Sequence, residues 1–333
     1  MPAKRTARVY RPTPANMARL AKVLARGGLV AVPTETVYGL AADALNPNAC
    51  RAIFKAKGRP ASDPLIVHVD SLAQAETIAE FNECARAVAK AFWPGPLTLI
   101  LPKKMRVPSI VTSGLPSVAV RMPDHRLFRE LIRRSGCPLA APSANPFGYI
   151  SPTAADHVRD GLSTRIKYIL NGGPAKIGVE STILDLRNQS HPALLRPGLI
   201  SVEAITAVLG KKITAYKGKI QPQRAAVAPG MLDRHYSPRT PLLVVKKITC
   251  HKIKLITADE AMIFFCKPTK PFGENIFWLT MTGSLEQAAH RLFHVLRHLD
   301  DGRWRKIYVE SIPGGASLAL AINDRLARAA AKR

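Results

Sequence analysis

The stretch LVAVPTETVYGL, residues 29–40, contains the clearest signal for the fold. Its first four residues are apolar, which is typical of a short buried strand. Pro33 cannot donate a hydrogen bond to a sheet, so the strand should end there. Thr34, Glu35 and Thr36 follow directly. Ligands of open α/β sheets bind beyond the carboxyl ends of the strands, so these hydroxyl and carboxylate groups predict a site for a small polar ligand.

A second segment, KAKGRPASDPLIVH at residues 55–68, supplies the opposite charge. Its start belongs to a predicted helix, and lysines at the end of a helix can simply complement the helix dipole. That explanation suits Arg59 poorly, because a glycine and a proline hold it in a turn. His68 ends the apolar run of the next predicted strand. A lone histidine there is more often a core residue, but this strand could pair beside the first.

Cations recur at the ends of predicted elements. A predicted strand ends at Arg121, and Arg196 is followed by a proline and a glycine. The loop PSANPFGYISPT, residues 142–153, offers the side chains of Ser143 and Asn145. One explanation is that Ser, Asn, Pro and Gly simply favour turns for local reasons. The alternative is that the loop binds a phosphate or ribose group. Several cations at such positions favour convergence on an anionic ligand.

Length and composition indicate a globular protein with more than one domain. The chain has 333 residues, of which 47% are hydrophobic, enough for two cores of ordinary size. No apolar run approaches the roughly 20 residues of a membrane span. The basic N-terminus lacks the apolar segment of a signal peptide. The five scattered cysteines fit reduced thiols, so we expect a cytoplasmic protein with no membrane partner.

Charge and the missing motifs narrow the chemistry. The 49 basic and 23 acidic residues give a net charge of +26, which favours phosphate groups or nucleic acid as partners. A general compositional bias explains the charge as well. The sequence has no Walker A loop, GxSxG elbow, HExxH helix, zinc-finger spacing or metal-ligand cluster. Without these motifs, the kind of catalysis that remains is positioning and charge stabilisation, as in phosphoryl or nucleotidyl transfer.

Six ordered segments resemble the YrdC-like threonylcarbamoyl-AMP synthases. The similarity covers roughly residues 12–210 and implies an α/β fold, a YrdC-like twisted mixed sheet with helices and a concave basic cleft. The matching segments are PTETVYGL (33–40), KGRP (57–60) with PLIVH (64–68), SVAVRMP (117–123), PSAN (142–145), ESTI (180–183) and LRPG (195–198).

The rest of the chain resembles the long, two-domain form of this family. Residues 211–241 contain PGM, HY and TP and are similar to the linker that closes over the active site in that form. Residues 242–333 alternate predicted strands and helices without a GxGxxG loop, which predicts a small Rossmann-like α/β domain without a dinucleotide. We therefore expect a catalytic domain at 1–210, a linker at 211–241 and a C-terminal domain at 242–333.

The resemblance also implies a reaction. The family condenses L-threonine with bicarbonate, and the resulting carboxylate attacks ATP to give threonylcarbamoyl-AMP and pyrophosphate. The adenylate serves threonylcarbamoyladenosine modification of tRNA. Mg²⁺ is expected with ATP, and tRNA-modifying enzymes are expected partners, with direct contact to tRNA or double-stranded RNA left open.

Residue roles carried over from the family define the expected site. Lys57 and Arg59 are the expected catalytic residues. The set expected to hold L-threonine is Thr36, His68, Arg121 and Ser181. The set expected to bind ATP is Lys57, Arg59, Asp63, Ser117, Ser143, Asn145, Ser151, Arg196, His235 and Tyr236. The family often has Asn at the position of Asp63. We expect no metal held by the protein alone.

Two other classes stay open. The charge alone would also suit a non-catalytic module that binds double-stranded RNA or tRNA. A carbamoyl-transfer enzyme of the hydrogenase-maturation type contains a related domain, but it would need acylphosphatase and zinc-finger segments that this sequence lacks.

Overall fold

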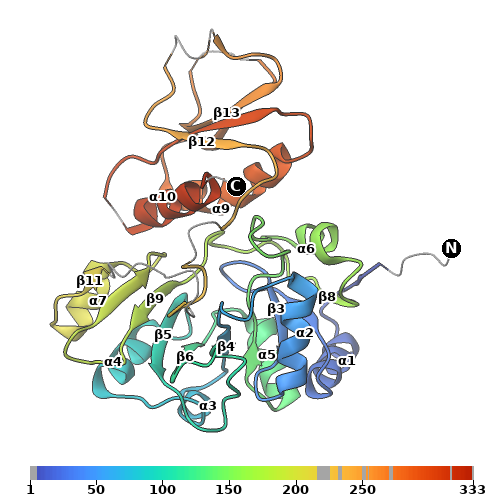
Figure 1. The fold of residues 1–333 in the computed structure, drawn as a ribbon, viewed down its shortest axis with the longest axis vertical. Coiled ribbons are helices and arrows are strands. Elements are labelled where there is room, and N and C mark those ends of the chain that lie inside the picture. The colour runs from blue at the N-terminus through green and yellow to red at the C-terminus, as the bar shows by residue number, and fades with distance from the viewer. Residues whose placement is uncertain are drawn as a thin grey trace.

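The computed structural model describes residues 6–215, 226–231, 235–249, 253, 255–269, 273–315 and 317–331. Its strands form an eleven-stranded sheet and a four-stranded sheet (Figure 1). The expected mixed α/β architecture with a second, smaller α/β unit is confirmed. The domain limits at 210 and 241 stay a prediction, and the short strand β11 (Thr214–Ala215) still pairs within the large sheet.

The large sheet is mixed. Its spatial order is β1-β8-β2-β3-β7-β4-β6-β5-β9-β10-β11. Two pairings position the site: β2 runs antiparallel to β3, and β4 runs parallel to β6 with His68 opposite Arg121. The remaining strands have these bounds: β1 Arg8–Tyr10, β2 Val30–Val32, β3 Gly39–Asp43, β4 Ile66–His68, β5 Leu97–Pro102, β6 Ser117–Arg121, β7 Leu139–Ala140, β8 Tyr168–Leu170, β9 Thr182–Asp185 and β10 Ala193–Arg196.

Helices cover both faces of the β2 region because its side chains alternate. Val30 and Val32 pack in a cluster with α1 and α5, whereas Ala31 joins the cluster of the opposite face with α2. The helices of this part are α1 Pro14–Ala25, α2 Pro47–Lys57, α3 Leu72–Glu76, α4 Glu83–Phe92, α5 Arg126–Ser135, α6 Ala155–Leu162 and α7 Val202–Leu209. Two-sided burial explains the apolar run that predicts β2.

One predicted helix is wrong in extent. Apolar spacing over residues 71–92 predicts a single helix, but the structure has α3 and α4 with a break between them. In the break, Ala79 forms a β-bridge with Lys103. The Asn82 side chain then caps α4 by accepting from the amide of Ala85. Asparagine at this position starts a new helix, which periodicity alone does not reveal.

The small sheet is entirely parallel, in the order β12-β15-β13-β14. Its strands are β12 Leu242–Val245, β13 Glu260–Cys266, β14 Ile276–Thr280 and β15 Lys306–Glu310, and its helices are α9 Leu285–Leu299 and α10 Ser317–Ala329. Apolar runs predict strands at 242–245, 261–266 and 306–310, and helical spacing predicts helices at 284–299 and 317–330; all are found, whereas β14 is not predicted. Both helices lie between the small sheet and the large domain (Figure 1). None of the helices in the described ranges is long and apolar enough to cross a membrane.

A separate apolar cluster lies where no helix covers the large sheet. It includes Ile66, Ile100 and Ile183 from three strands. Ala228 and Met231, which follow the large domain in sequence, are buried in the same cluster. The segment 226–231 therefore covers an apolar part of the sheet beside the pocket described next.

Candidate active site

The loop after β2 is shaped by a threonine side chain. The Thr34 hydroxyl donates to the carbonyl of Val37 at 2.6 Å and accepts from the amides of Thr36 and Val37 at 3.1 Å. Such local bonds replace the ladder bonds that the strand loses at Pro33. The Thr36 hydroxyl lies 2.8 Å from that of Thr34, at the exit of the strand where a ligand site was expected.

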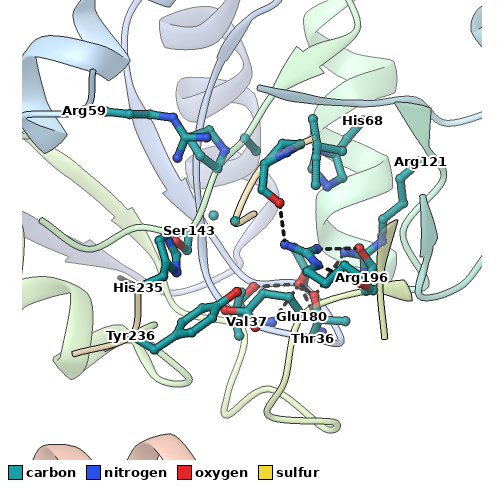
Figure 2. A pocket seen from close by; sticks show the side chains of 18 residues that line it. Thr36, Val37, Arg59, His68, Arg121, Ser143, Glu180, Arg196, His235 and Tyr236 are labelled. Atoms are coloured by element: carbon teal, nitrogen blue, oxygen red, sulfur yellow. Dashed lines mark hydrogen bonds between the residues drawn. The ribbon is translucent and has the colours of Figure 1, made fainter. Parts of the chain in front are cut away.

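This exit opens into a pocket built from segments that lie far apart in the sequence (Figure 2). Nine of the expected site residues line it, namely Thr36, Arg59, His68, Arg121, Ser143, Ser181, Arg196, His235 and Tyr236. Pro229, Gly230, His235 and Tyr236 of the linker complete the wall. The enclosed volume is only about 50 Å³, whereas sites for small-molecule ligands usually measure about 300–1,000 Å³. The described residues, those of the linker included, therefore leave less space than a ligand of that kind needs.

Arg121 forms a buried ion pair in this pocket. Its Nη2 atom lies 2.5 Å from Oε1 of Glu35, and each side chain is 4% exposed. Its Nη1 donates to the Thr36 hydroxyl at 3.1 Å, and its Nε donates to the carbonyl of Gly95 at 3.2 Å. Neither carboxylate oxygen of Glu35 accepts a hydrogen bond from the described residues. The pair fixes a planar cation beside the expected threonine site.

Arg59 is held in a similar way. Its Nη2 lies 2.9 Å from Oδ2 of Asp63 and also donates to the carbonyl of Pro64 at 2.6 Å, while its Nε donates to the carbonyl of Asp63 at 2.9 Å. Burial raises the pKa of Asp63, although Arg59 opposes this. Both oxygens of the Asp63 carboxylate lack a hydrogen bond within the described residues. Arg59 therefore lines the pocket, and Asp63, which lies outside the pocket lining, partly offsets its positive charge.

Lys57 does not line the pocket. It is 2% exposed, and its Nζ donates to the carbonyls of Ser143 and Asn145 at 2.5 and 2.6 Å. Burial lowers the pKa of Lys57 well below its usual value, and the nearby Arg59 adds to this. In this state Lys57 holds the loop that carries Ser143, and its contact with phosphate stays a prediction.

Two histidines in the pocket are buried and neutral. Burial, and then the charge of Arg121, lowers the pKa of His68 well below its usual value. Burial, and then Arg59, does the same for His235. The Nδ1 atom of each ring has no partner in the described part of the chain. Unpaired nitrogens on buried rings are available for a ligand, because a buried polar atom gains from any partner.

Tyr236 closes the pocket from the linker side. Its backbone has a φ of 62°, a left-handed conformation that is unusual for a tyrosine. Its ring stacks on Phe293 of α9 with centroids 5.4 Å apart, and its hydroxyl has no described hydrogen-bond partner. Burial, followed by the charge of Glu180, raises the pKa of Tyr236 to about 12. The strained backbone is thus held by packing against the small domain.

The opposite wall is a network around Ser181. Its hydroxyl lies 2.8 Å from that of Thr98 and accepts from Nη2 of Arg196 at 3.1 Å. Arg196 also donates to the carbonyls of Ser181 and Pro229, at 3.0 and 3.3 Å. Arg196 therefore ties the wall of the large sheet to the linker.

Five expected site residues lie outside the pocket lining: Lys57, Asp63, Ser117, Asn145 and Ser151. Ser117 lies at the start of β6, four residues before Arg121, and is buried. Asn145 donates to the carbonyls of Pro146 and Tyr149. Ser151 donates to Oε1 of Glu180 at 2.6 Å. Their proposed contacts with the nucleotide stay predictions.

Two carboxylates of the site were not among the residues assigned a role, although Glu35 belongs to the strand exit that predicts a polar-ligand site. Glu180 lines the pocket, and Glu35 pairs with Arg121 behind it. Their positions within TETVYG and ESTI were visible in the sequence, but the pairing of each with an arginine far along the chain was not. No group of three or more His, Cys, Asp or Glu side chains in the described residues could hold a metal ion.

The fold and the site define an α/β enzyme class with a cationic pocket at the exit of sheet strands, lined in part by residues of the segment between the two sheets. The family described as "Telomere recombination" matches residues 22–198, and the one described as "Threonylcarbamoyl-AMP synthase, C-terminal domain" matches residues 200–331. The chain belongs to the threonylcarbamoyl-AMP synthase family.

Relatives with that name resemble the chain over nearly its whole length. The threonylcarbamoyl-AMP synthase of Pyrococcus abyssi is 44% identical over 319 residues, 92% of each chain. That of Bacillus subtilis is 42% identical over 333 residues, 95% of this chain and 93% of its own. The crystal structure of P. abyssi Sua5 complexed with L-threonine is 40% identical and superposes with a TM-score of 0.87, covering 97% of this chain and 96% of the other.

Proposed function

We propose that the chain converts L-threonine, bicarbonate and ATP to threonylcarbamoyl-AMP and pyrophosphate in the pocket of Figure 2. The observation that carries the proposal is the convergence of Arg59, Arg121 and Arg196 on one pocket that hydroxyl groups also line. N-carboxythreonine and ATP are both anionic, so their reaction needs cations that offset their mutual repulsion.

The chemistry requires positioning rather than a covalent intermediate. A carboxylate oxygen of N-carboxythreonine attacks the α-phosphorus of ATP, and the bond from that phosphorus to the bridging oxygen of pyrophosphate breaks. Arg121, which pairs with Glu35, would hold the carboxylate of threonine. Thr36 and Ser181, which line the same pocket, would bind the polar groups of that substrate. A fixed geometry of this kind lowers the entropy that the reaction must lose.

The phosphates belong on the Arg59 side of the pocket. Arg59 presents its guanidinium there, and Ser143 follows on the loop that Lys57 holds. Arg196 and His235 border the space from the sheet and the linker. Lys57 would reach the phosphates only if its Nζ gave up its hydrogen bonds to the carbonyls of Ser143 and Asn145. Because these carbonyls belong to the loop that carries Ser143, Nζ would have only a short distance to move.

Mg²⁺ fits this site as an ion that arrives with the triphosphate. Mg²⁺ usually binds through phosphates, water and one or two carboxylates. The carboxylate of Asp63, which accepts no described hydrogen bond, is the group beside Arg59 that could meet it. Bound there, the ion would withdraw negative charge from the phosphates.

The linker must move before ATP can bind. ATP is larger than a space of about 50 Å³, so the linker residues that line the pocket, Pro229, Gly230, His235 and Tyr236, would leave it and return after binding. The apolar cluster that receives Met231 and the stacking of Tyr236 on Phe293 stabilise the returned position. Closure would then exclude water from the adenylate.

The product would pass to tRNA-modifying partner enzymes in the cytoplasm. Threonylcarbamoyl-AMP is a mixed anhydride, which water hydrolyses, so prompt use by an acceptor enzyme suits its chemistry. The high net charge is compatible with an approach to tRNA.

Substitution of two of the three arginines, Arg59 and Arg121, tests this function. Arg59→Ala should raise the KM for ATP, and Arg121→Ala should raise the KM for threonine, because each side chain is placed on a different substrate. Arg187→Ala, an exposed arginine on the same domain, is the matched control. Equal effects of Arg59→Ala and Arg121→Ala on both substrates would contradict the assignment.

A further inference from the structure

A buried arginine of the small domain, Arg325, contacts the wall of the pocket. Arg325 lies on α10 and is completely buried. Its Nε lies 3.1 Å from Oε2 of Glu180, a carboxylate that lines the pocket. Its Nη2 donates to the backbone carbonyl of Glu180 at 3.3 Å, and its Nη1 donates to that of Pro197 at 2.6 Å. One guanidinium thus bridges two segments of the pocket wall.

Glu180 passes this contact on to a neighbouring loop. Its Oε1 accepts from the Ser151 hydroxyl at 2.6 Å, while Oε2 faces Arg325. Both oxygens of the carboxylate are therefore engaged, one by the large domain and one by the small domain. The orientation of Glu180 in the pocket depends on both contacts.

A second arginine of the small domain holds the same loop by its backbone. Arg297 of α9 donates to the carbonyls of Ile150 and Ser151, the latter at 3.3 Å. It also donates to the carbonyl of His157 at 3.4 Å. The small domain consequently acts on Ser151 in two ways. Arg297 donates directly to its carbonyl, and Arg325 acts indirectly, through the Glu180 carboxylate that accepts from its hydroxyl.

Arg325 also supports the linker. Its guanidinium lies over the ring of Tyr236, 5.7 Å from the centroid. Cation–π contacts strengthen when they are shielded from water, and this one is buried. The residue thus touches the fixed wall and the closing segment at the same time.

Burial of such an ion pair is not an efficient way to stabilise a fold. Removing both charges from water is costly, and an apolar pair of similar size is often as stable. An arginine that satisfies four partners across a domain boundary is better explained by the geometry that it imposes.

We propose that Arg325 is a positioning residue of the active site, which acts through Glu180 and makes the small domain part of the catalytic pocket. The proposal rests on the proposed function for its kinetic consequences, but its structural consequence can be measured without it.

The test compares the full-length variants Arg325→Met, Arg325→Lys and Glu180→Gln with a control in the same domain. The control is Arg305→Met, which removes an exposed arginine paired with Asp259 and Glu260 far from the pocket. Hydrogen–deuterium exchange of the peptides that cover residues 148–155 and 179–182 is measured without substrates. Arg325→Met should speed exchange in both peptides by about tenfold or more, because local opening becomes easier where a buried pair is lost. Arg305→Met should not change it.

Kinetics then separate positioning from folding. Arg325→Met should raise a substrate KM or lower kcat by about tenfold or more, because it leaves Glu180 unpaired. Arg325→Lys should recover part of the loss, since it keeps the charge without the planar fork. The double variant Glu180→Gln with Arg325→Met should be more active than Arg325→Met alone, because the uncompensated carboxylate is gone.

The outcomes distinguish the two proposals. Normal exchange at both peptides in Arg325→Met, or losses that simply multiply in the double variant, would overturn the role of Arg325. A wild-type protein that forms no adenylate while Arg325→Met speeds exchange would instead overturn the proposed function and leave the positioning role in place.

Discussion

Replacing Arg121 by methionine should both destabilise the large domain and weaken threonine binding. The substitution keeps an apolar stem in β6 but removes the guanidinium that pairs with Glu35 at 2.5 Å. Glu35 then remains 4% exposed, with neither oxygen accepting a described hydrogen bond. Thr36 and Gly95 lose a donor each.

The magnitude follows from this isolation of the carboxylate. Breaking a buried ion pair by removing one partner typically costs about 3–5 kcal/mol. Arg187 pairs with Asp185 at 2.6 Å in an exposed position of the same domain, where such a pair contributes about 0–1 kcal/mol. Arg187→Met is therefore the matched control. Adding Glu35→Gln to Arg121→Met should recover much of the loss, because it neutralises the stranded charge.

Urea denaturation followed by circular dichroism measures the stability of each variant. Titration of threonine in a pyrophosphate-release assay measures substrate binding. We expect a large loss of stability in Arg121→Met, a small one in Arg187→Met, and a threonine KM that rises only in the former. Equal stability losses in the two variants would refute the claim that removal of Arg121 leaves the Glu35 carboxylate buried and without a compensating charge.

Three further predictions concern pH, a glycine and a tyrosine. Burial lowers the pKa of His157 to about 4, whereas an unfolded histidine titrates near 6.5, so the unfolded state binds the proton first and stability should fall as pH drops below about 6.5; urea midpoints at pH 8 and pH 5 measure this, and His157→Gln should make the dependence shallower without abolishing it, because burial also lowers the pKa values of His68 and His235. In Gly198→Ala the new Cβ would lie 2.3 Å from the amide nitrogen of Thr182, so the backbone next to Ser181 must shift, and activity should fall more than the melting temperature; unchanged kinetics would contradict this. Tyr236→Phe removes a buried hydroxyl that has no partner in the described residues, so stability should hold or rise, and a clear fall in the denaturation midpoint would refute that reading.

The sequence predicts the parts of the fold that depend on local pattern. The strand before Pro33 ends as expected because proline cannot continue a ladder. The helix predicted before Gly58 is found as α2, Pro47–Lys57. Asn46 caps its start and Gly58 caps its end, and both are residue types that favour these positions. The prediction fails between α3 and α4, where pairing of Ala79 with Lys103 interrupts a continuous helical pattern. That contact joins segments which sequence spacing does not relate.

The site shows the same division. Cations and hydroxyls at the ends of predicted elements, together with the family resemblance, predict which residues gather, and nine of the expected residues line one pocket. The sequence could not predict which groups each cation contacts. Lys57, for example, donates to carbonyls of a loop 86 residues away. Arg325 gave no signal either, since an arginine on an amphipathic helix normally faces solvent. The similarity to known synthases confirms the family prediction, while the role of each site residue stays a prediction.

The most direct test is an assay for product in which ATP and Mg²⁺ are supplied and L-threonine and bicarbonate are each present or omitted. Isotope-labelled bicarbonate allows the adenylate to be followed by mass spectrometry alongside pyrophosphate. We predict equal amounts of pyrophosphate and labelled threonylcarbamoyl-AMP, formed only when both substrates are present. Pyrophosphate release that ignores threonine, or a folded protein that incorporates no label, would contradict the account.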